Sequence, residues 1–183
     1  MLVKNIVEED FVNYKLPSMF IATCFCDWKC CIEQNLDISI CQNASISKQP
    51  NIMISDSEIY ERYISNPITK AIVIGGLEPF RQYDDMYNLI ELFRSNGCND
   101  TFVIYTGYEL CEEPVESKLS EIQLLKNIIL KTGRFIPNHK PHYDDVLGVN
   151  LISDNQKGVI ISDFYYYLCH AYYEFCCLLV FQR

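Results

Sequence analysis

Short apolar runs alternate with amphipathic stretches through most of the chain. The runs at 19–23, 71–74 and 101–105 are continuously apolar and contain β-branched or aromatic residues, which predicts strands buried on both faces. Residues 84–95 and 117–128 instead carry apolar side chains three and four positions apart, the spacing of an amphipathic helix. Strands and helices are therefore expected to follow one another in turn.

Weaker patterns extend this alternation. Ser57 followed by residues 58–64 predicts a helix whose first turn is capped by a serine side chain. Residues 127–130 and 146–149 predict two further strands, and the stretch 43–57, rich in Asn, Ser and Gln, predicts a loop. Because strands that alternate with helices pair in parallel, we predict an α/β fold with a parallel sheet. Ligands in such folds bind at the carboxyl ends of the strands.

The C-terminal residues differ in character from the rest of the chain. We predict one domain over residues 1–157 and an apolar tail over 158–183. Residues 164–181 are almost wholly apolar and aromatic apart from His170 and Glu174, and their length approaches that of a membrane span. We favour a terminal helix packed on the sheet, with no membrane partner. A membrane span and a divergent tail are the two alternatives.

Net charge narrows the range of partners. The 183 residues carry a formal charge of −9, with hydrophobic and charged fractions that are ordinary for a globular protein. Binding a nucleic acid requires a surplus of Lys and Arg on one face, so we expect no nucleic-acid partner. A local basic pocket for one small anionic ligand is still compatible with this charge.

Cysteine placement points to a metal site. Five of the ten cysteines lie between Cys24 and Cys41, which suits a metal centre better than a set of separated disulfides. The first residues, MLVKNIVEED, contain no apolar signal-peptide segment, so we expect a cytoplasmic protein with reduced thiols. Thiolates are soft, charged donors that suit zinc and iron–sulfur clusters. Three thiolates on a four-iron cluster leave one iron open to a substrate, whereas four usually give an electron carrier.

The spacing of these cysteines carries a family resemblance. Cys26 and Cys30 form a Cys-x3-Cys pair, and Cys41 follows with an Asn two positions later. This resembles the cluster loop of radical S-adenosylmethionine enzymes, most closely the activating proteins of anaerobic ribonucleotide reductases. Their usual pattern is Cys-x3-Cys-x2-Cys-x-Asn, so the second gap is here expanded from two residues to ten. Cys41 is the preferred third ligand because it keeps the trailing Asn, and Cys31 and Cys24 are the alternatives.

Further segments resemble the same family in the same order. Gly75–Pro79 resembles its Gly-Gly-Glu-Pro segment with one inserted residue, and Ile104–Tyr108 resembles its Tyr-Thr-Gly-Tyr segment. Gly133–Phe135 and Ser153–Gln156 resemble its Gly-Arg/Pro-Phe and Ser-x-Asn-Gln segments. The resemblance covers about residues 18 to 157 and implies an incomplete (β/α) barrel of parallel strands.

The resemblance also implies a set of site residues. A 4Fe-4S cluster would be bound by Cys26, Cys30 and Cys41. S-adenosylmethionine would be contacted by Gly75, Gly76, Glu78, Thr106, Tyr108 and Asn155. Glycines let the backbone approach a ligand closely, and the Glu78 carboxylate would neutralise the ammonium of the methionine moiety. No catalytic acid, base or nucleophile is predicted, because the cofactor carries the hard chemistry.

The implied reaction is the reductive cleavage of S-adenosylmethionine to methionine and a 5′-deoxyadenosyl radical. The implied partners are a glycyl-radical enzyme, which would lose a glycine hydrogen to that radical, and an electron donor such as flavodoxin or ferredoxin. Two alternatives come from other functional classes. One is a 4Fe-4S redox or adaptor module without S-adenosylmethionine chemistry, which the expanded cysteine gap and the extra Leu77 favour. The other is an interaction domain stabilised by zinc.

Overall fold

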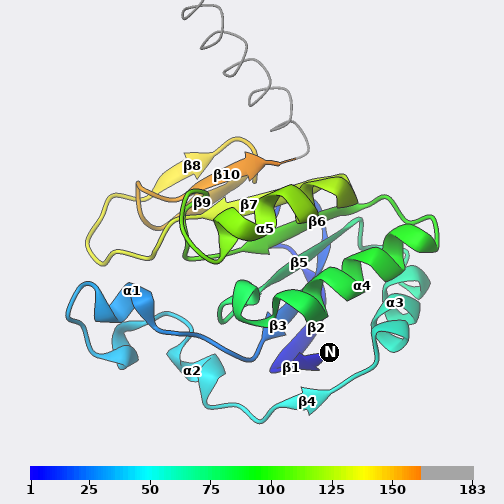
Figure 1. The fold of residues 1–183 in the computed structure, drawn as a ribbon, viewed down its shortest axis with the longest axis horizontal. Helices are drawn as coiled ribbons and strands as arrows, with labels where there is room; N and C mark the ends of the chain where they lie inside the picture. The colour runs from blue at the N-terminus through cyan, green and yellow to red at the C-terminus, as the bar shows by residue number, and fades with distance from the viewer. Residues whose placement is uncertain (162–183) are drawn as a thin grey trace, which may run out of the picture.

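A six-stranded sheet forms the centre of the protein in a computed structural model, which describes residues 1–161 (Figure 1). The strand order is β10-β7-β6-β5-β3-β2, and the four middle strands run parallel while β2 and β10 pair antiparallel at the two edges. The six strands span Asn5–Asp10 (β2), Ser18–Thr23 (β3), Ala71–Gly76 (β5), Thr101–Tyr105 (β6), Ile128–Thr132 (β7) and Lys157–Ile160 (β10). An α/β fold with a mostly parallel sheet is thus confirmed.

Three main helices connect the parallel strands and cover one face of the sheet (Figure 1). They span Asp56–Ser65 (α3), Tyr83–Ser95 (α4) and Val115–Ile122 (α5). Shorter elements are the helices Lys29–Ile32 (α1) and Ala44–Ser47 (α2), and the 3-10 helices Ile38–Ile40 (η1), Pro79–Gln82 (η2) and Gln123–Leu125 (η3). Two small antiparallel sheets lie outside the central sheet: Leu2–Val3 (β1) with Ile52–Met53 (β4), and His142–Asp144 (β8) with Val149–Leu151 (β9).

The two faces of the sheet bury different side chains. On the helix-covered face, alternate residues of each strand join one large apolar core, whose largest members include Phe93 on α4 and Phe102 on β6. On the other face, a smaller cluster centres on Val73 and Val103 and is covered by Tyr14 and Leu147 from loops outside the sheet. Alternation of side chains across each strand separates these two cores.

Local details differ from the sequence prediction in four places. The helix predicted over 117–128 begins earlier, as α5, and the helical stretch ends with η3 at Leu125, before β7 begins at Ile128. Ser55 rather than Ser57 caps α3, because the Ser55 side chain accepts a hydrogen bond from the Glu58 backbone N–H. The predicted loop at 43–57 contains α2 and β4. The predicted strand at 146–149 begins only at its last residue, because the preceding residues form the turn between β8 and β9.

The C-terminal end of the described chain pairs with the sheet. β10 crosses the predicted boundary between residues 157 and 158 and lies antiparallel to β7. The apolar stretch 164–181, for which a terminal helix was predicted, lies outside the described residues. Within residues 1–161, no helix combines the length and apolar character needed to cross a membrane.

Candidate functional site

The carboxyl ends of the four parallel strands meet at one edge of the sheet. β3 leads into the cysteine-rich segment 24–43, called here the cysteine loop. β5 leads into Leu77 and Glu78, β6 into Thr106 and β7 into Gly133. Because these strands are parallel and adjacent, the four loops gather at the same edge, as the sequence predicts.

A cavity of about 300 Å³ opens among these loops, on the face of the sheet opposite the helices. Six of the predicted site residues line it: Cys26, Cys30, Cys41, Gly76, Glu78 and Thr106. Other lining residues come from the strand face, from β9 and from the loops after β7 and β9, including Tyr105, Lys131, Phe135, Asn150 and Gln156. Segments far apart in the chain therefore form one concave site.

The three predicted cluster ligands reach this cavity together, and the two alternative cysteines do not. Cys24 is buried beside the start of α4, where its backbone N–H donates to Gln82 Oε1 at 2.5 Å. Cys31 is also buried and is absent from the cavity lining, although its Sγ lies 3.9 Å from Cys30 Sγ.

The thiols have a chemistry that fits a cluster. The neighbouring Cys30 thiol lowers the pKa of Cys41, which favours the thiolate that metals bind. The interaction with Cys41, together with burial, raises the pKa of Cys30, and burial raises that of Cys26 to about 12. Cationic iron would compensate the cost of deprotonating these two buried thiols.

The geometry is not that of a single-ion site. Within residues 1–161, no group of three or more His, Cys, Asp or Glu side chains is arranged to hold one metal ion. A cubane is larger than an ion, so its protein thiolates stand further apart than the ligands of one ion do. Cys26, Cys30 and Cys41 all line one cavity, where a group of that size could contact all three.

Two of the predicted motifs contact each other directly. Asn43, which follows Cys41 in the motif, donates its side-chain N–H to the backbone carbonyl of Gly76. Gly76 has a φ of +83°, and a Cβ there would lie 2.9 Å from the backbone of Ala22 on β3. Glycine is therefore needed for both conformation and space. These contacts hold the end of the cysteine loop against the end of β5.

Glu78 is a fully buried carboxylate at the centre of the site. Its Oε1 accepts hydrogen bonds from Thr106 Oγ1 at 2.8 Å and from the Phe80 backbone N–H at 3.2 Å, and its Oε2 accepts from the Gly107 N–H at 2.9 Å. Burial nevertheless raises the pKa of Glu78 to about 7, because its three hydrogen-bond donors only partly replace the water that would solvate an exposed carboxylate. Glu78 thus joins the β5 and β6 loops while it borders the cavity.

Three predicted contact residues lie outside the cavity lining. Gly75 packs between strands, since a Cβ there would lie 3.2 Å from both Phe20 and Tyr105. Tyr108 is buried and donates its hydroxyl to Asp27. The Asn155 side chain donates to the Arg134 carbonyl at 2.9 Å, while the neighbouring Gln156 lines the cavity.

Lys131 is a site residue that the sequence analysis missed. Its ammonium is buried, borders the cavity and donates to the Gly133 carbonyl at 2.9 Å. Burial lowers the pKa of Lys131 to about 8. The signal in the sequence was a single charged residue inside an otherwise apolar strand, where an unpaired lysine is rarely buried. A buried cation and a buried carboxylate therefore border the same cavity.

Comparison with known proteins identifies the family. The searches of curated proteins and of solved structures found no match. A sequence model described as a 4Fe-4S single cluster domain matches residues 18–156. This span agrees with the 18–157 over which the motifs run, and it contains all three cysteines of the cavity. The predicted 4Fe-4S cofactor is confirmed at the level of the family, and the chain belongs to the 4Fe-4S single cluster domain family.

Proposed function

We propose that this protein binds a 4Fe-4S cluster through Cys26, Cys30 and Cys41 and cleaves S-adenosylmethionine reductively to a 5′-deoxyadenosyl radical. The observation that carries the proposal is the meeting of these cysteines with Gly76, Glu78 and Thr106 around one cavity. The open, mostly parallel sheet is compatible with an incomplete (β/α) barrel of the radical S-adenosylmethionine type.

Cys26, Cys30 and Cys41 of the cysteine loop would hold the cluster as thiolates, with no fourth protein ligand needed. When bound, a cluster with three protein ligands supplies one electron and an open iron site for a small ligand. The Asn43 contact to Gly76 orients Cys41 relative to the end of β5. The cavity proposed to hold the ligand lies between the cysteine loop and the end of β5.

The charged side chains of the cavity match a zwitterionic ligand. The methionine moiety of S-adenosylmethionine carries an ammonium and a carboxylate. Glu78 is suited to the ammonium, and a cationic ligand would keep this carboxylate ionised near neutral pH. Lys131 has donor capacity beyond its one bond to Gly133 and is suited to the carboxylate. The proposed substrate thus supplies the opposite charge to each buried group.

The proposed substrate of the radical is a glycine of a partner enzyme, such as an anaerobic ribonucleotide reductase. Support comes from the order of the motifs, which resembles that of the activating proteins of these reductases. An external flavodoxin or ferredoxin would supply the electron. A reducing cytoplasm is part of this proposal, because the cluster and its free thiols require it.

The test is anaerobic reconstitution with iron and sulfide, followed by reduction with dithionite in the presence of S-adenosylmethionine. We expect 5′-deoxyadenosine in the chromatogram, formed only by protein that holds the cluster. Protein reconstituted without sulfide is the matched control. A brown four-iron protein that forms no 5′-deoxyadenosine, with or without a candidate glycyl-radical partner, would instead indicate a redox or adaptor module.

A further inference from the structure

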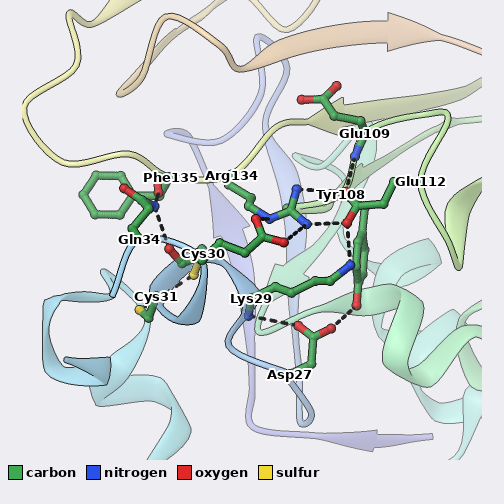
Figure 2. A network of polar contacts seen from close by, with 12 residues as sticks. Asp27, Lys29, Cys30, Cys31, Gln34, Tyr108, Glu109, Glu112, Arg134 and Phe135 are labelled. Atoms are coloured by element: carbon green, nitrogen blue, oxygen red, sulfur yellow. Dashed lines mark hydrogen bonds and ion pairs between the residues drawn. The ribbon is translucent and has the colours of Figure 1, made fainter. Parts of the chain in front are cut away.

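A network of charged side chains ties the cysteine loop to the ends of β6 and β7 (Figure 2). It lies beside the cavity, and none of its charged members lines the cavity itself. Its members from the cysteine loop flank Cys26 and Cys30: Asp27, Lys29 and Gln34, which Figure 2 labels, and Glu33, which pairs with Arg134. Its members from the sheet edge are Tyr108, Glu112, Arg134 and Phe135.

Glu112 is the centre of this network. Its carboxylate accepts from Lys29 Nζ at 2.5 Å and from Arg134 Nη1 at 2.8 Å, with a second bond from Arg134 Nη2. Paired bonds between a guanidinium and a carboxylate are both directional and stronger than neutral hydrogen bonds. Glu112 therefore joins the cysteine loop to two loops of the sheet edge.

Arg134 extends the network to a second carboxylate. Its guanidinium reaches Glu33, just beyond α1, with Nε 2.8 Å from Glu33 Oε2 and Nη2 donating to Oε1 at 3.1 Å. The Glu33 side chain is about half exposed, whereas those of Arg134 and Glu112 are mostly buried, so water screens the Arg134–Glu112 pair less than it screens a surface pair. One guanidinium thus bridges the cysteine loop and the β6 loop.

Uncharged donors reinforce both sides of the loop. The Gln34 side-chain N–H donates to the Cys30 carbonyl at 2.6 Å and to the Phe135 carbonyl at 2.9 Å. On the other side of Cys30, Tyr108 donates its hydroxyl to Asp27. The segment between Asp27 and Gln34 is therefore fastened at both ends.

The cysteine loop needs such an attachment because its own secondary structure is weak. α1 and α2 have four residues each, far below the length at which a helix is stable by itself. Most of the loop is partly exposed, and Ile32 on α1 is turned to solvent with 67% of its surface exposed. Without contacts to the sheet edge, cluster binding alone would have to compensate the entropic cost of ordering the loop.

We propose that the Glu112–Arg134 pair is a latch that holds residues 27–34 against the sheet before the cluster binds and slows the loss of the cluster afterwards. Both residues act as positioning residues through the loop, without contact to the ligand. The second half of this inference rests on the proposed cysteine ligands, and the first half does not.

The first experiment measures amide hydrogen exchange in the full chain before iron is added. In Glu112→Gln we expect exchange of residues 27–34 to be about tenfold faster than in the wild type, because the charged bonds that oppose local opening are weakened. The matched control is Asp100→Asn, which weakens the 2.6 Å bond from Tyr63 at the opposite edge of the sheet. Equal exchange of residues 27–34 in wild type and Glu112→Gln would overturn the latch.

The second experiment follows cluster loss from reconstituted protein in the presence of an iron chelator. We expect loss to be about tenfold faster in Glu112→Gln and unchanged in Asp100→Asn, even where both variants lower the unfolding temperature. A role in general stability would accelerate loss in both. Equal rates in Glu112→Gln and the wild type would contradict retention by the latch.

Two further variants test whether Glu112 and Arg134 act together. Arg134→Lys keeps a charge but lacks the fork that bridges two carboxylates, so we expect an intermediate rate of exchange. The double variant Glu112→Gln/Arg134→Gln should exchange faster than either single variant but by less than the two effects combined, because the bond between the two residues is lost only once while the Lys29 and Glu33 contacts are lost separately. Fully additive effects would show that the residues act independently. If the wild type forms no cluster, the proposed function fails, and the exchange measurements still decide the latch.

Discussion

The two faces of the central sheet are both buried, but their side chains serve different purposes. Leu130 and Lys131 are neighbours on β7, and alternation places them on opposite faces. Leu130 joins the helix-covered core with other large apolar residues. Lys131 enters the cavity, where burial of an ammonium costs free energy. The helix face therefore stabilises the fold, whereas the cavity face lowers stability because it buries charged groups that form a site.

Residue size shows the same contrast. β5 places Ile72 and Ile74 toward the helices and Ala71, Val73 and Gly75 toward the other face. Large side chains fill the space between sheet and helix, whereas small ones leave room near the carboxyl edge. Changes on the helix face should therefore alter stability, and changes on the cavity face should alter ligand binding.

The largest expected effect is on the cavity face. Replacing Cys26, Cys30 or Cys41 singly by Ala should abolish a stable four-iron cluster, because each removes one of three thiolate ligands. Cys24→Ala and Cys31→Ala are matched controls that should keep it, since neither thiol lines the cavity. Iron content and visible absorbance after anaerobic reconstitution measure the effect. Full cluster content in Cys41→Ala with loss in Cys31→Ala would reassign the third ligand.

On the helix face, Phe93→Ala should lower the free energy of unfolding by about 3–5 kcal/mol. Phe93 is fully buried, and its ring lies 5.0 Å from that of Tyr60 and 5.2 Å from that of Phe102. Phe135→Ala is the control on the cavity face, where the side chain is only partly buried and should cost less. Urea denaturation of the two variants measures the difference. Similar losses would contradict the contrast between the faces.

Glu78 should make stability depend on pH. Its pKa is raised from 4.5 to about 7 in the folded state, so the folded protein binds this proton more tightly than the unfolded chain. Stability from this group is therefore complete below about pH 4.5 and falls as the pH rises toward 7, by on the order of 3 kcal/mol. Glu78→Gln should flatten the curve in that window. An unchanged slope in urea titrations at several pH values would refute the raised pKa.

Lys131→Met should change ligand preference more than stability. We expect the wild type to prefer S-adenosylmethionine to its decarboxylated form by about tenfold or more, because a charged hydrogen bond is lost without the carboxylate. The variant should bind both alike and unfold at no lower denaturant concentration, since it no longer buries an ammonium. Lys157→Met, at an exposed position on β10, is the control. Isothermal titration with both ligands separates these outcomes.

The smallest effect is expected at a helix end far from the cavity. Ser55→Ala should destabilise the protein by about 1 kcal/mol, because the first turn of α3 loses its cap. Ser57→Ala should change stability by less, since Ser57 lies inside the helix and its side chain does not cap the first turn. Thermal unfolding of the two variants distinguishes the caps. Cluster content should be unchanged in both.

Much of the framework could be predicted from the sequence. The apolar runs at 19–23, 71–74 and 101–105 all lie in parallel strands of the sheet. Continuous apolar runs and helical spacing are local properties that burial imposes directly on sequence. Element ends were less predictable, as the cap at Ser55 shows, because two serines close together offer the same local signal.

The site was only partly predictable, because its local sequence signals were also ambiguous. The Cys-x3-Cys spacing indicated a cluster, but three cysteines competed for the third position. Only tertiary structure brings Cys41 to the cavity and leaves Cys24 and Cys31 outside it. Lys131 was missed because its burial depends on loops that follow other strands. Tyr108 and Asn155, two of the predicted contacts, form hydrogen bonds to other loop residues and lie outside the cavity lining.

The sequence by itself determined the alternating elements, the cysteine chemistry and the match to a 4Fe-4S domain, because these depend on periodicity, residue type and spacing along the chain. Tertiary structure alone decided which thiols share a cavity, which charges are buried in it and how the Glu112–Arg134 pair fastens the cysteine loop. Those properties depend on distances between residues far apart in the chain, and such distances exist only once the parallel strands have brought their carboxyl ends together.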